Sequence, residues 1–281
     1  MTTKGQRQHR QKAPRRGSRT GALLWAGGLL IIFAGLAAFA YARNEAQAPE
    51  PSPKPFWSGD FDGGDFRQYE TIQEAAPDRI ATVTSPTREG RYSARLTAND
   101  ADLLGGENPR AQLMTGPMHK PGDDRYIGWS TYFPGDFPAM DAPGAFFVFF
   151  QFHGEPYSGS PAIGFGVGAD GRIELERDAR YGYDRVWSAP LVRDRWIDFV
   201  IHVKWSKDED EGFIELWING NRQTFEANGE ERLYTQTVQD DQNEGVRTIP
   251  TNYRRHGSVP GDVTVFHDDV KVGATYESVA P

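Results

Sequence analysis

RWIDFVIHVKW, residues 195–205, alternates between apolar and polar side chains with a period of two. Its apolar positions are Ile197, Phe199, Ile201, Val203 and Trp205, and the polar positions between them include Asp198, His202 and Lys204. This pattern is typical of a β-strand that buries one face and leaves the other face polar. The stretch therefore predicts a sheet with one side packed on a core.

The segments around this stretch repeat the pattern in pairs. GFIELWINGNRQTF (residues 212–225) predicts two strands joined at Asn219-Gly220, a strong signal for a two-residue hairpin. IGFGVGADGRIELE (residues 163–176) has the same organisation around Asp170-Gly171. We expect further strands near residues 92–98, 110–115, 126–133, 145–153 and 263–272, and a long loop over residues 228–250. About ten strands and no amphipathic helix predict an all-β, two-sheet antiparallel β-sandwich of the jelly-roll, concanavalin-like type.

The N-terminal part of the chain has a different composition. Residues 1–20 form a basic tail, and residues 21–42 (GALLWAGGLLIIFAGLAAFAYA) are uncharged and apolar over roughly the 20 residues that cross a bilayer. We expect a single transmembrane anchor with a cytoplasmic N-terminus, or a secreted protein if the apolar run is a signal that is cleaved. Residues 43–55 are a proline-rich linker, and residues 56–281 are expected to form one extracytoplasmic domain.

Charge and composition exclude several functions. Seven of the 31 basic residues and none of the 39 acidic residues lie in the first 19 positions, so the remainder has 24 basic residues and a net charge of −15. An acidic domain is a poor partner for nucleic acid. Cysteine is absent, which excludes disulfides and thiol chemistry. No motif predicts a catalytic metal or a required cofactor, although the adjacent Asp268 and Asp269 could hold a structural Ca²⁺.

The stretch FFVFFQFHG, residues 146–154, combines an apolar strand with an amide and an imidazole. Strict alternation places Phe146, Val148, Phe150 and Phe152 between the sheets, and Phe147, Phe149, Gln151 and His153 on the opposite face. Two aromatic rings followed by Gln and His suit the floor of a sugar-binding groove. Gln151 and His153 could equally mark the point where the strand leaves the core.

Two other stretches offer side chains of complementary chemistry. NPRAQLM places Arg110 and Gln112 on one strand face, and TNYRRHG places Tyr253 and Arg255 on one face if it is extended. Such a set suits β-elimination at a uronic acid. Arg and Gln neutralise the carboxylate and stabilise the enolate-like intermediate, while His or Tyr takes the C5 proton and Tyr protonates the departing O4.

At these residues the sequence resembles the jelly-roll polysaccharide lyases that include glucuronan lyase and are similar to heparin lyase I. The resemblance spans residues 56–273, and its most specific elements are Gln151-Phe152-His153-Gly154 and the later Tyr253-Arg254. It implies His153 and Tyr253 as proton-transfer residues and Arg110 as a uronate ligand. Gln151 and Gln112 are implied as supporting donors. We group Arg254, Arg255, Phe147 and Phe149 with Gln112 as substrate-binding candidates.

The sequence departs from the family pattern before Tyr253. Ile249 and Thr251 stand where family members often have Lys and Gly, so Arg247, Arg254 or Arg255 would have to supply the positive charge. The acidic composition favours a polyuronate such as glucuronan or an alginate-like polymer over a densely sulfated chain. Two alternatives stay open: a glycoside hydrolase that uses Glu174 and Glu176, and a membrane-tethered, non-catalytic carbohydrate-binding module.

Overall fold

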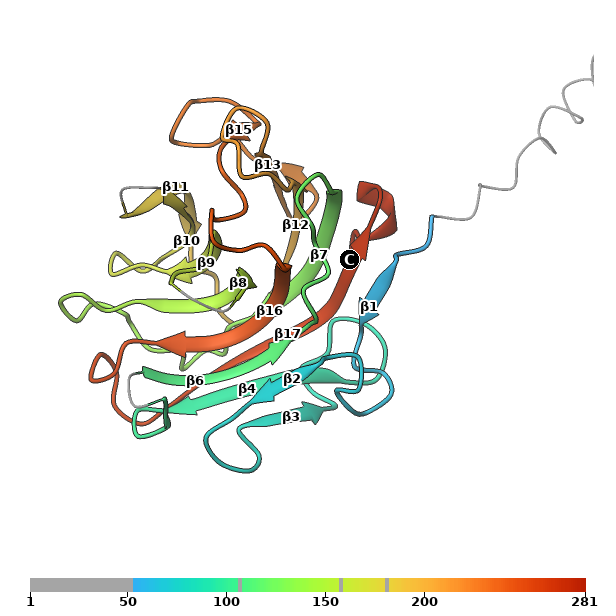
Figure 1. Ribbon diagram of the computed structural model, residues 1–281. Coiled ribbons are helices and arrows are strands. Elements are labelled where there is room, and N and C mark those ends of the chain that lie inside the picture. Colours follow the sequence, from blue (N-terminus) through green and yellow to red (C-terminus); the bar gives the residue numbers. More distant parts are fainter. Residues whose placement is uncertain (1–52, 106–107, 157–158, 180–181) are drawn as a thin grey trace, which may run out of the picture. The chain divides into compact units, whose positions relative to one another are not determined.

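A computed structural model describes residues 53–105, 108–156, 159–179 and 182–281 (Figure 1). The predicted basic tail and apolar segment, and nearly all of the linker, lie outside these residues. Within the described part of the chain, no helix is long and apolar enough to span a membrane. Two antiparallel sheets and one short 3₁₀ helix, η1 (Tyr276–Ser278), account for its regular structure.

The first sheet has nine strands and contains the stretch from which the fold was predicted. Its order is β14-β13-β12-β7-β17-β4-β3, with β1 paired to β17 and β15 paired to β13. The strands are β1 (Trp57–Gly59), β3 (Ile80–Val83), β4 (Ser93–Asn99), β7 (Asp124–Tyr132), β12 (Trp196–Lys204), β13 (Phe213–Ile218), β14 (Asn221–Arg222), β15 (Leu233–Tyr234) and β17 (Asp262–Gly273).

The second sheet has eight strands and contains the stretches with candidate chemistry. Its order is β11-β10-β9-β8-β16-β6-β2, with β5 paired to β6. The strands are β2 (Thr71–Gln73), β5 (Leu103–Leu104), β6 (Asn108–Met114), β8 (Phe147–Glu155), β9 (Ile163–Val167), β10 (Arg172–Ala179), β11 (Gly182–Pro190) and β16 (Gly245–Arg254). Figure 1 shows β6, β16 and β8 side by side, although β16 lies far from both in the sequence.

An aromatic core joins the two sheets. Trp129 of β7 stacks on Phe150 of β8 with ring centroids 3.9 Å apart, and on Phe199 of β12 at 5.0 Å. Phe165 of β9 meets Phe199 at 5.6 Å. These contacts bury large rings from both sheets against one another, which is the main source of stability in a sandwich. The predicted two-sheet antiparallel β-sandwich is confirmed.

Two local predictions were wrong. The segment 228–250 is not a single loop, because it contains β15 and the first half of β16. The first half of β16 has no hydrophobic period because both of its faces are covered. Thr248 is fully buried, and its hydroxyl bonds His119 Nε2 at 2.8 Å.

The second wrong prediction is the side-chain alternation along β8. The register against β9 shifts between Val148 and Phe150, so the strand contains a bulge at Phe149. As a result Phe147 and Phe149 are buried in the core, with 1% and 0% of their surface exposed. Phe146 and Val148 face the opposite side, where the sequence pattern had placed Phe147 and Phe149. Gln151 and Phe152, beyond the bulge, keep their predicted faces because the bulge adds one residue and then alternation resumes.

Candidate active site

The face of the eight-stranded sheet that points away from the core brings together most of the predicted residues. We call it the site face. The strand register places Tyr253 of β16 beside Arg110 of β6 and Val148 of β8, and it places Gln112 of β6 beside Thr251. Residues directly opposite one another in neighbouring strands share a face, so one row of side chains crosses three strands.

A cavity of about 310 Å³ opens on the site face. It is lined by Asn108, Phe146, Val148, Gln151, Ser160, Pro161, Gly164, Glu176 and Tyr253. The lining combines an aromatic and aliphatic wall with an amide, a phenol and a carboxylate. Cavities of this composition are typical of sites for small polar ligands such as sugar units.

Tyr253 has the most organised environment in the cavity. Asn108 Nδ2 donates a hydrogen bond to Tyr253 Oη at 3.1 Å, and the guanidinium carbon of Arg110 lies 5.0 Å from the centre of the phenol ring. The centroid of the Phe146 ring, just before β8, lies 5.2 Å from that of Tyr253. Because Oη accepts the bond from Asn108, its own proton is directed elsewhere and is available to a ligand. Arg110 Nη2 donates to the carbonyl oxygen of Leu104 at 3.3 Å, and its Nε is buried with no hydrogen-bond partner among the described residues.

Three amides form a hydrogen-bonded chain across the site face. Gln151 Nε2 donates to Gln112 Oε1 at 2.9 Å, and Gln112 Nε2 donates to Gln73 Oε1 at 2.7 Å. Thr251 Oγ1 also donates to Gln112 Oε1, at 3.1 Å. Gln112 is therefore hydrogen-bonded to neighbouring side chains, and only 1% of its surface is exposed. It positions Gln151 and does not itself contact the cavity.

His153 lies two residues beyond Gln151 and is buried. Its Nδ1 lies 3.0 Å from the carbonyl oxygen of Gly154, and its Nε2 lies 3.3 Å from that of Gly159. Burial lowers the pKa of His153 below its ordinary value of 6.5, against the opposing effect of these carbonyls. The imidazole is therefore neutral at neutral pH. It does not line the cavity around Tyr253, and Nε2 would have to leave Gly159 to take a proton from a ligand.

The arginines proposed to replace the missing lysine have different environments. Ile249, at the lysine position, is fully buried beside Gln151. Arg247 is paired with Glu70 and Glu155, each at 3.0 Å. Arg254 was predicted to bind substrate, but the structure buries it fully, and it donates to main-chain carbonyls, including that of Gly261 at 2.7 Å.

Arg255 lies just past the end of β16 and is exposed. Its guanidinium donates to the carbonyl oxygen of Gly144 at 2.9 Å, which ties it to the loop before β8. Of the arginines near this face, Arg110 is the one that lies over Tyr253. It is therefore the best-placed cation for a uronate.

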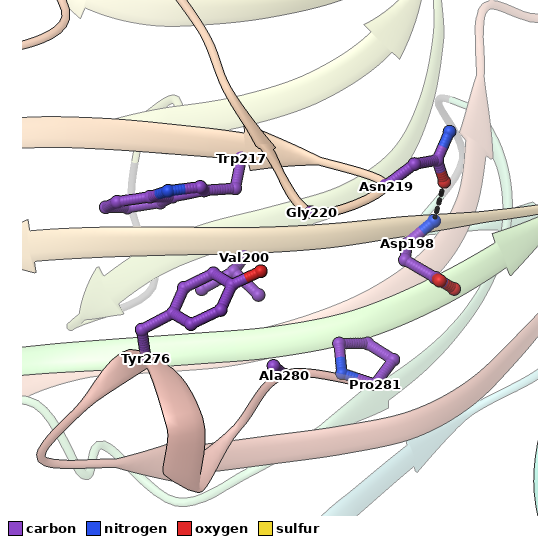
Figure 2. Close-up of a pocket in the computed structure, with 8 residues that line it drawn as sticks. All are labelled: Asp198, Val200, Trp217, Asn219, Gly220, Tyr276, Ala280 and Pro281. Carbon is purple, nitrogen blue, oxygen red and sulfur yellow. Dashed lines mark hydrogen bonds between the residues drawn. The ribbon is translucent and has the colours of Figure 1, made fainter. Parts of the chain in front are cut away.

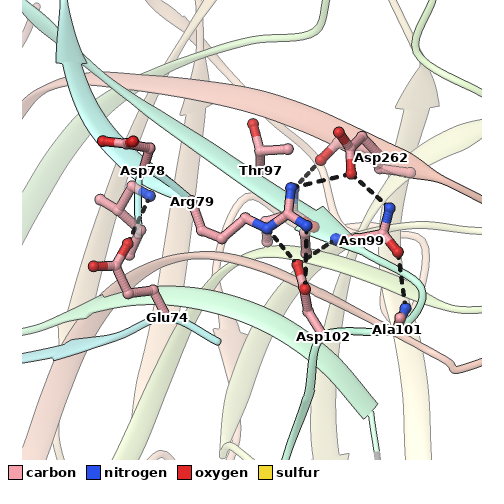
Figure 3. Close-up of polar contacts among 12 residues, drawn as sticks. Glu74, Asp78, Arg79, Thr97, Asn99, Ala101, Asp102 and Asp262 are labelled. Carbon is pink, nitrogen blue, oxygen red and sulfur yellow. Dashed lines mark hydrogen bonds and ion pairs between the residues drawn. The ribbon is translucent and has the colours of Figure 1, made fainter. Parts of the chain in front are cut away.

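A polar network surrounds the turn that follows β4 (Figure 3). Arg79 pairs with Asp102 at 2.7 Å and with Asp262 at 3.1 Å, and Asn99 Nδ2 donates to Asp262 at 2.7 Å. Asp100, in the same turn, lies 3.5 Å from the Arg254 guanidinium. The network joins the turn after β4 to the start of β17 and to the end of β16, the strand that contains Tyr253.

Glu174 and Glu176 of β10 also belong to the site face. Their register partners on β9 are Gly166 and Gly164, which in turn pair with Val148 and Gln151 of β8. Burial and the charge of Glu176 raise the pKa of Glu174 to about 7, and burial raises the pKa of Glu176.

A second cavity, of about 220 Å³, lies on the outer face of the nine-stranded sheet (Figure 2). Trp217 and Tyr276 line it with ring centroids 5.3 Å apart. Its one side-chain carboxylate, Asp198, already binds Arg88 at 2.9 Å and accepts a bond from Ser130 at 2.7 Å. This arrangement leaves no free acid–base pair there among the described residues, so the chemistry is better placed on the site face.

The adjacent acids at the end of the chain have internal partners. Asp268 accepts bonds from the main-chain N–H groups of Arg88 and Asp269, at 2.7 and 2.8 Å, and Asp269 pairs with Lys271 at 2.7 Å. Within the described ranges, no group of three or more His, Asp or Glu side chains could hold a metal ion. A structural Ca²⁺ at Asp268 and Asp269 stays a prediction.

Comparison with known proteins assigns the family. The profile of the polysaccharide lyase family matches residues 61–271, which is most of the chain. The chain belongs to this family. The protein is accordingly an enzyme, a polysaccharide lyase. No curated protein matches it.

Solved structures agree on the fold of the lyase. The endo-β-1,4-glucuronan lyase from the fungus Trichoderma reesei superposes with a TM-score of 0.64 at 17% identity, over 81% of this chain and 99% of that one. The catalytic domain of a glycoside hydrolase family 131 protein from Coprinopsis cinerea gives 0.57 at 12% identity, over 82% and 98%. A β-glucanase of the same hydrolase family from Podospora anserina gives 0.57 at 11% identity, over 81% and 99%. At these identities the likeness shows a shared fold.

Sequence reasoning missed six of the nine residues that line the lyase's cavity: Asn108, Phe146, Val148, Ser160, Pro161 and Gly164. Asn108 precedes Arg110 by two residues, so the alternation of β6 would have placed it on the same face. Phe146 and Val148 were assigned to the core because the bulge at Phe149 leaves no mark in the hydrophobic pattern.

Proposed function

We propose that this lyase cleaves a uronate-containing polysaccharide by β-elimination at the cavity of the site face. The observation that supports this most strongly is Tyr253: its hydroxyl accepts a bond from Asn108, its ring lies under the Arg110 guanidinium, and it lines the same cavity as Gln151. A phenol, a cation and an amide are the groups that elimination at a uronate requires.

The proposed reaction begins at the uronate carboxylate. Arg110 and Gln151 bind the carboxylate and stabilise the charge that develops when C5 loses its proton. The C5–H bond breaks, its electrons form the C4–C5 double bond, and the C4–O4 bond breaks. O4 receives a proton from Tyr253, whose hydroxyl is held by Asn108. The products are an unsaturated uronate and a new chain end.

His153 is our candidate for the base that removes the C5 proton. Its lowered pKa keeps it neutral, which is the form that accepts a proton. In this role Nε2 exchanges its contact with the Gly159 carbonyl, now 3.3 Å away, for the substrate. If His153 does not take the proton, Tyr253 has to begin the reaction as a phenolate, which removes the C5 proton and then returns it to O4.

The location of the reaction is also a proposal. The apolar run at residues 21–42, with basic residues before it, supports an extracytoplasmic domain that is either anchored by this segment or released by signal cleavage. We further infer that the sandwich is a jelly roll.

Ultraviolet absorbance of the unsaturated uronate tests the proposed reaction, since hydrolysis does not create that double bond. The full chain is incubated with glucuronan, alginate, pectate, hyaluronan and heparin. We expect absorbance to rise with a uronate polymer other than heparin, and Tyr253→Phe to abolish the rise. Loss of chain length without absorbance would contradict β-elimination.

One observation favours a second candidate, a glycoside hydrolase. The pKa of Glu174 is raised to about 7, as expected for a general acid, and Glu176 lines the cavity. Hydrolysis would yield saturated products, and both Glu174→Gln and Glu176→Gln would abolish it.

A further inference from the structure

The two ends of the site face have opposite charge. At the β6–β16 end, Arg110 lies 5.0 Å from the ring centre of Tyr253. At the β10 end, Glu174 and Glu176 project from the same face, and Glu176 lines the same cavity as Tyr253. A glycan that crosses the strands from β16 to β10 therefore meets a cation first and carboxylates second.

A strip without side chains separates these ends. On β9, Gly164 pairs with Gln151 on one side and Glu176 on the other. A Cβ added at Gly164 would meet only Pro161 Cγ within 4 Å, at 3.9 Å, so the space above this glycine is open. Two strand spacings, roughly 10 Å, separate β8 from β10. The floor between Gln151 and Glu176 is thus bare backbone, wide enough to seat a sugar ring.

The two glutamates are only partly neutralised by a neighbouring cation. Arg185 of β11 is 2.7 Å from Asp170 but 3.6 Å from Glu174. Burial raises the pKa of both carboxyl groups, that of Glu174 to about 7, so Glu174 is ionised above that pH. Ionised carboxylates repel a uronate, whereas they accept hydrogen bonds from the hydroxyl groups of a neutral sugar.

We propose that the β9–β10 end of the site face is a subsite for an uncharged sugar. The substrate is then a glycan in which uronate alternates with a neutral sugar, rather than a homopolymer of uronate. This inference rests on the proposed function, because it takes the uronate to be bound at Arg110 and Tyr253.

The test compares two polymers at pH 8 with the full chain. One is glucuronan, in which every sugar carries a carboxylate, and the other is an unsulfated polymer in which glucuronate alternates with N-acetylhexosamine. We expect the wild type to have the higher kcat/KM on the alternating polymer. Glu176→Gln is expected to raise kcat/KM on glucuronan about fivefold relative to the alternating polymer, the size of one partly exposed like-charge contact. Glu277→Gln, an exposed change on η1, is the matched control and is expected to leave the ratio unchanged.

The possible outcomes separate this inference from the proposed function. If glucuronan is the better substrate of the wild type, or if Glu176→Gln leaves the ratio unchanged, the neutral subsite is contradicted while β-elimination stands. If neither polymer gives a rise in absorbance, β-elimination of glucuronate is contradicted. The subsite is then tested by measuring the binding of the same two polymers by calorimetry instead of kcat/KM. A Glu176→Gln variant that does not improve glucuronan binding then contradicts the subsite as well.

Discussion

Replacing Phe149 by alanine tests the bulge that defines the site face. Phe149 is fully buried, and its ring lies 5.2 Å from Phe133 and 5.6 Å from Phe199. Deleting a buried phenyl ring removes its transfer free energy and leaves a cavity, which costs about 3–5 kcal/mol of unfolding free energy. The matched change is Phe146→Ala. Phe146 is half-buried on the site face, so we expect a cost of about 1 kcal/mol or less.

Urea unfolding of the full chain measures both values, with tryptophan fluorescence as the signal. Trp129 is a suitable reporter because it stacks on Phe199 at 5.0 Å, in the same cluster as Phe149. The two variants should also differ in activity, since Phe146 lines the cavity and Phe149 does not. We expect Phe146→Ala to lower kcat/KM while most of its stability is retained. If Phe149→Ala were the milder change and Phe146→Ala the severe one, side chains would alternate along β8 without a bulge, and the proposed cavity would be wrong.

The remaining predictions concern the site and its support. Tyr253→Phe keeps the ring that packs on Phe146 but removes the hydroxyl. We therefore expect kcat/KM to fall by roughly a hundredfold or more, with the melting temperature unchanged. A fall of less than threefold would exclude Tyr253 as the acid. The acidic limb of the pH profile of kcat/KM should lie below pH 6.5, because burial lowers the pKa of His153 and only the neutral ring accepts a proton. A limb above pH 7 that disappears in His153→Gln would show that the pKa of His153 is raised instead. Gly164→Val should fill the floor of the cavity and raise KM with little change in melting temperature, since only Pro161 lies within 4 Å of the added Cβ; an unchanged KM would show that the substrate does not cross β9. Arg254→Met should lower the unfolding free energy by roughly 2–4 kcal/mol in a urea titration, because the change leaves buried carbonyl acceptors without a donor. Normal stability together with lost activity would instead show that Arg254 binds the substrate.

The sequence predicted the sandwich well because alternation is a direct physical consequence of one buried strand face. The stretch around Phe199 forms β12, and the Asn219-Gly220 turn joins β13 to β14. The pattern failed where a strand is covered on both sides. β16 was taken for a loop over its first half, because buried Thr248 is satisfied by a hydrogen bond to His119 rather than by apolar packing.

The candidate site was predicted in part. Alternation over two residues correctly placed Gln151 on the outer face of β8, and Arg110 is adjacent to Tyr253 as the chemistry requires. The bulge at Phe149 decides which aromatic side chains lie on the site face. The sequence does not reveal this bulge, because the strand is apolar on both faces and one extra apolar residue leaves its composition unchanged. The burial of Arg254 could not be foreseen either, because its acceptors are main-chain carbonyls brought close by the turns.

One measurement tests the central claim most directly: the ultraviolet absorbance of the full chain and of Tyr253→Phe, incubated with the panel of uronate polymers. We expect a rise in absorbance with at least one polymer for the wild type and none for Tyr253→Phe. An equal rise in both proteins would contradict the assignment of Tyr253, and polymer cleavage without any rise would contradict β-elimination.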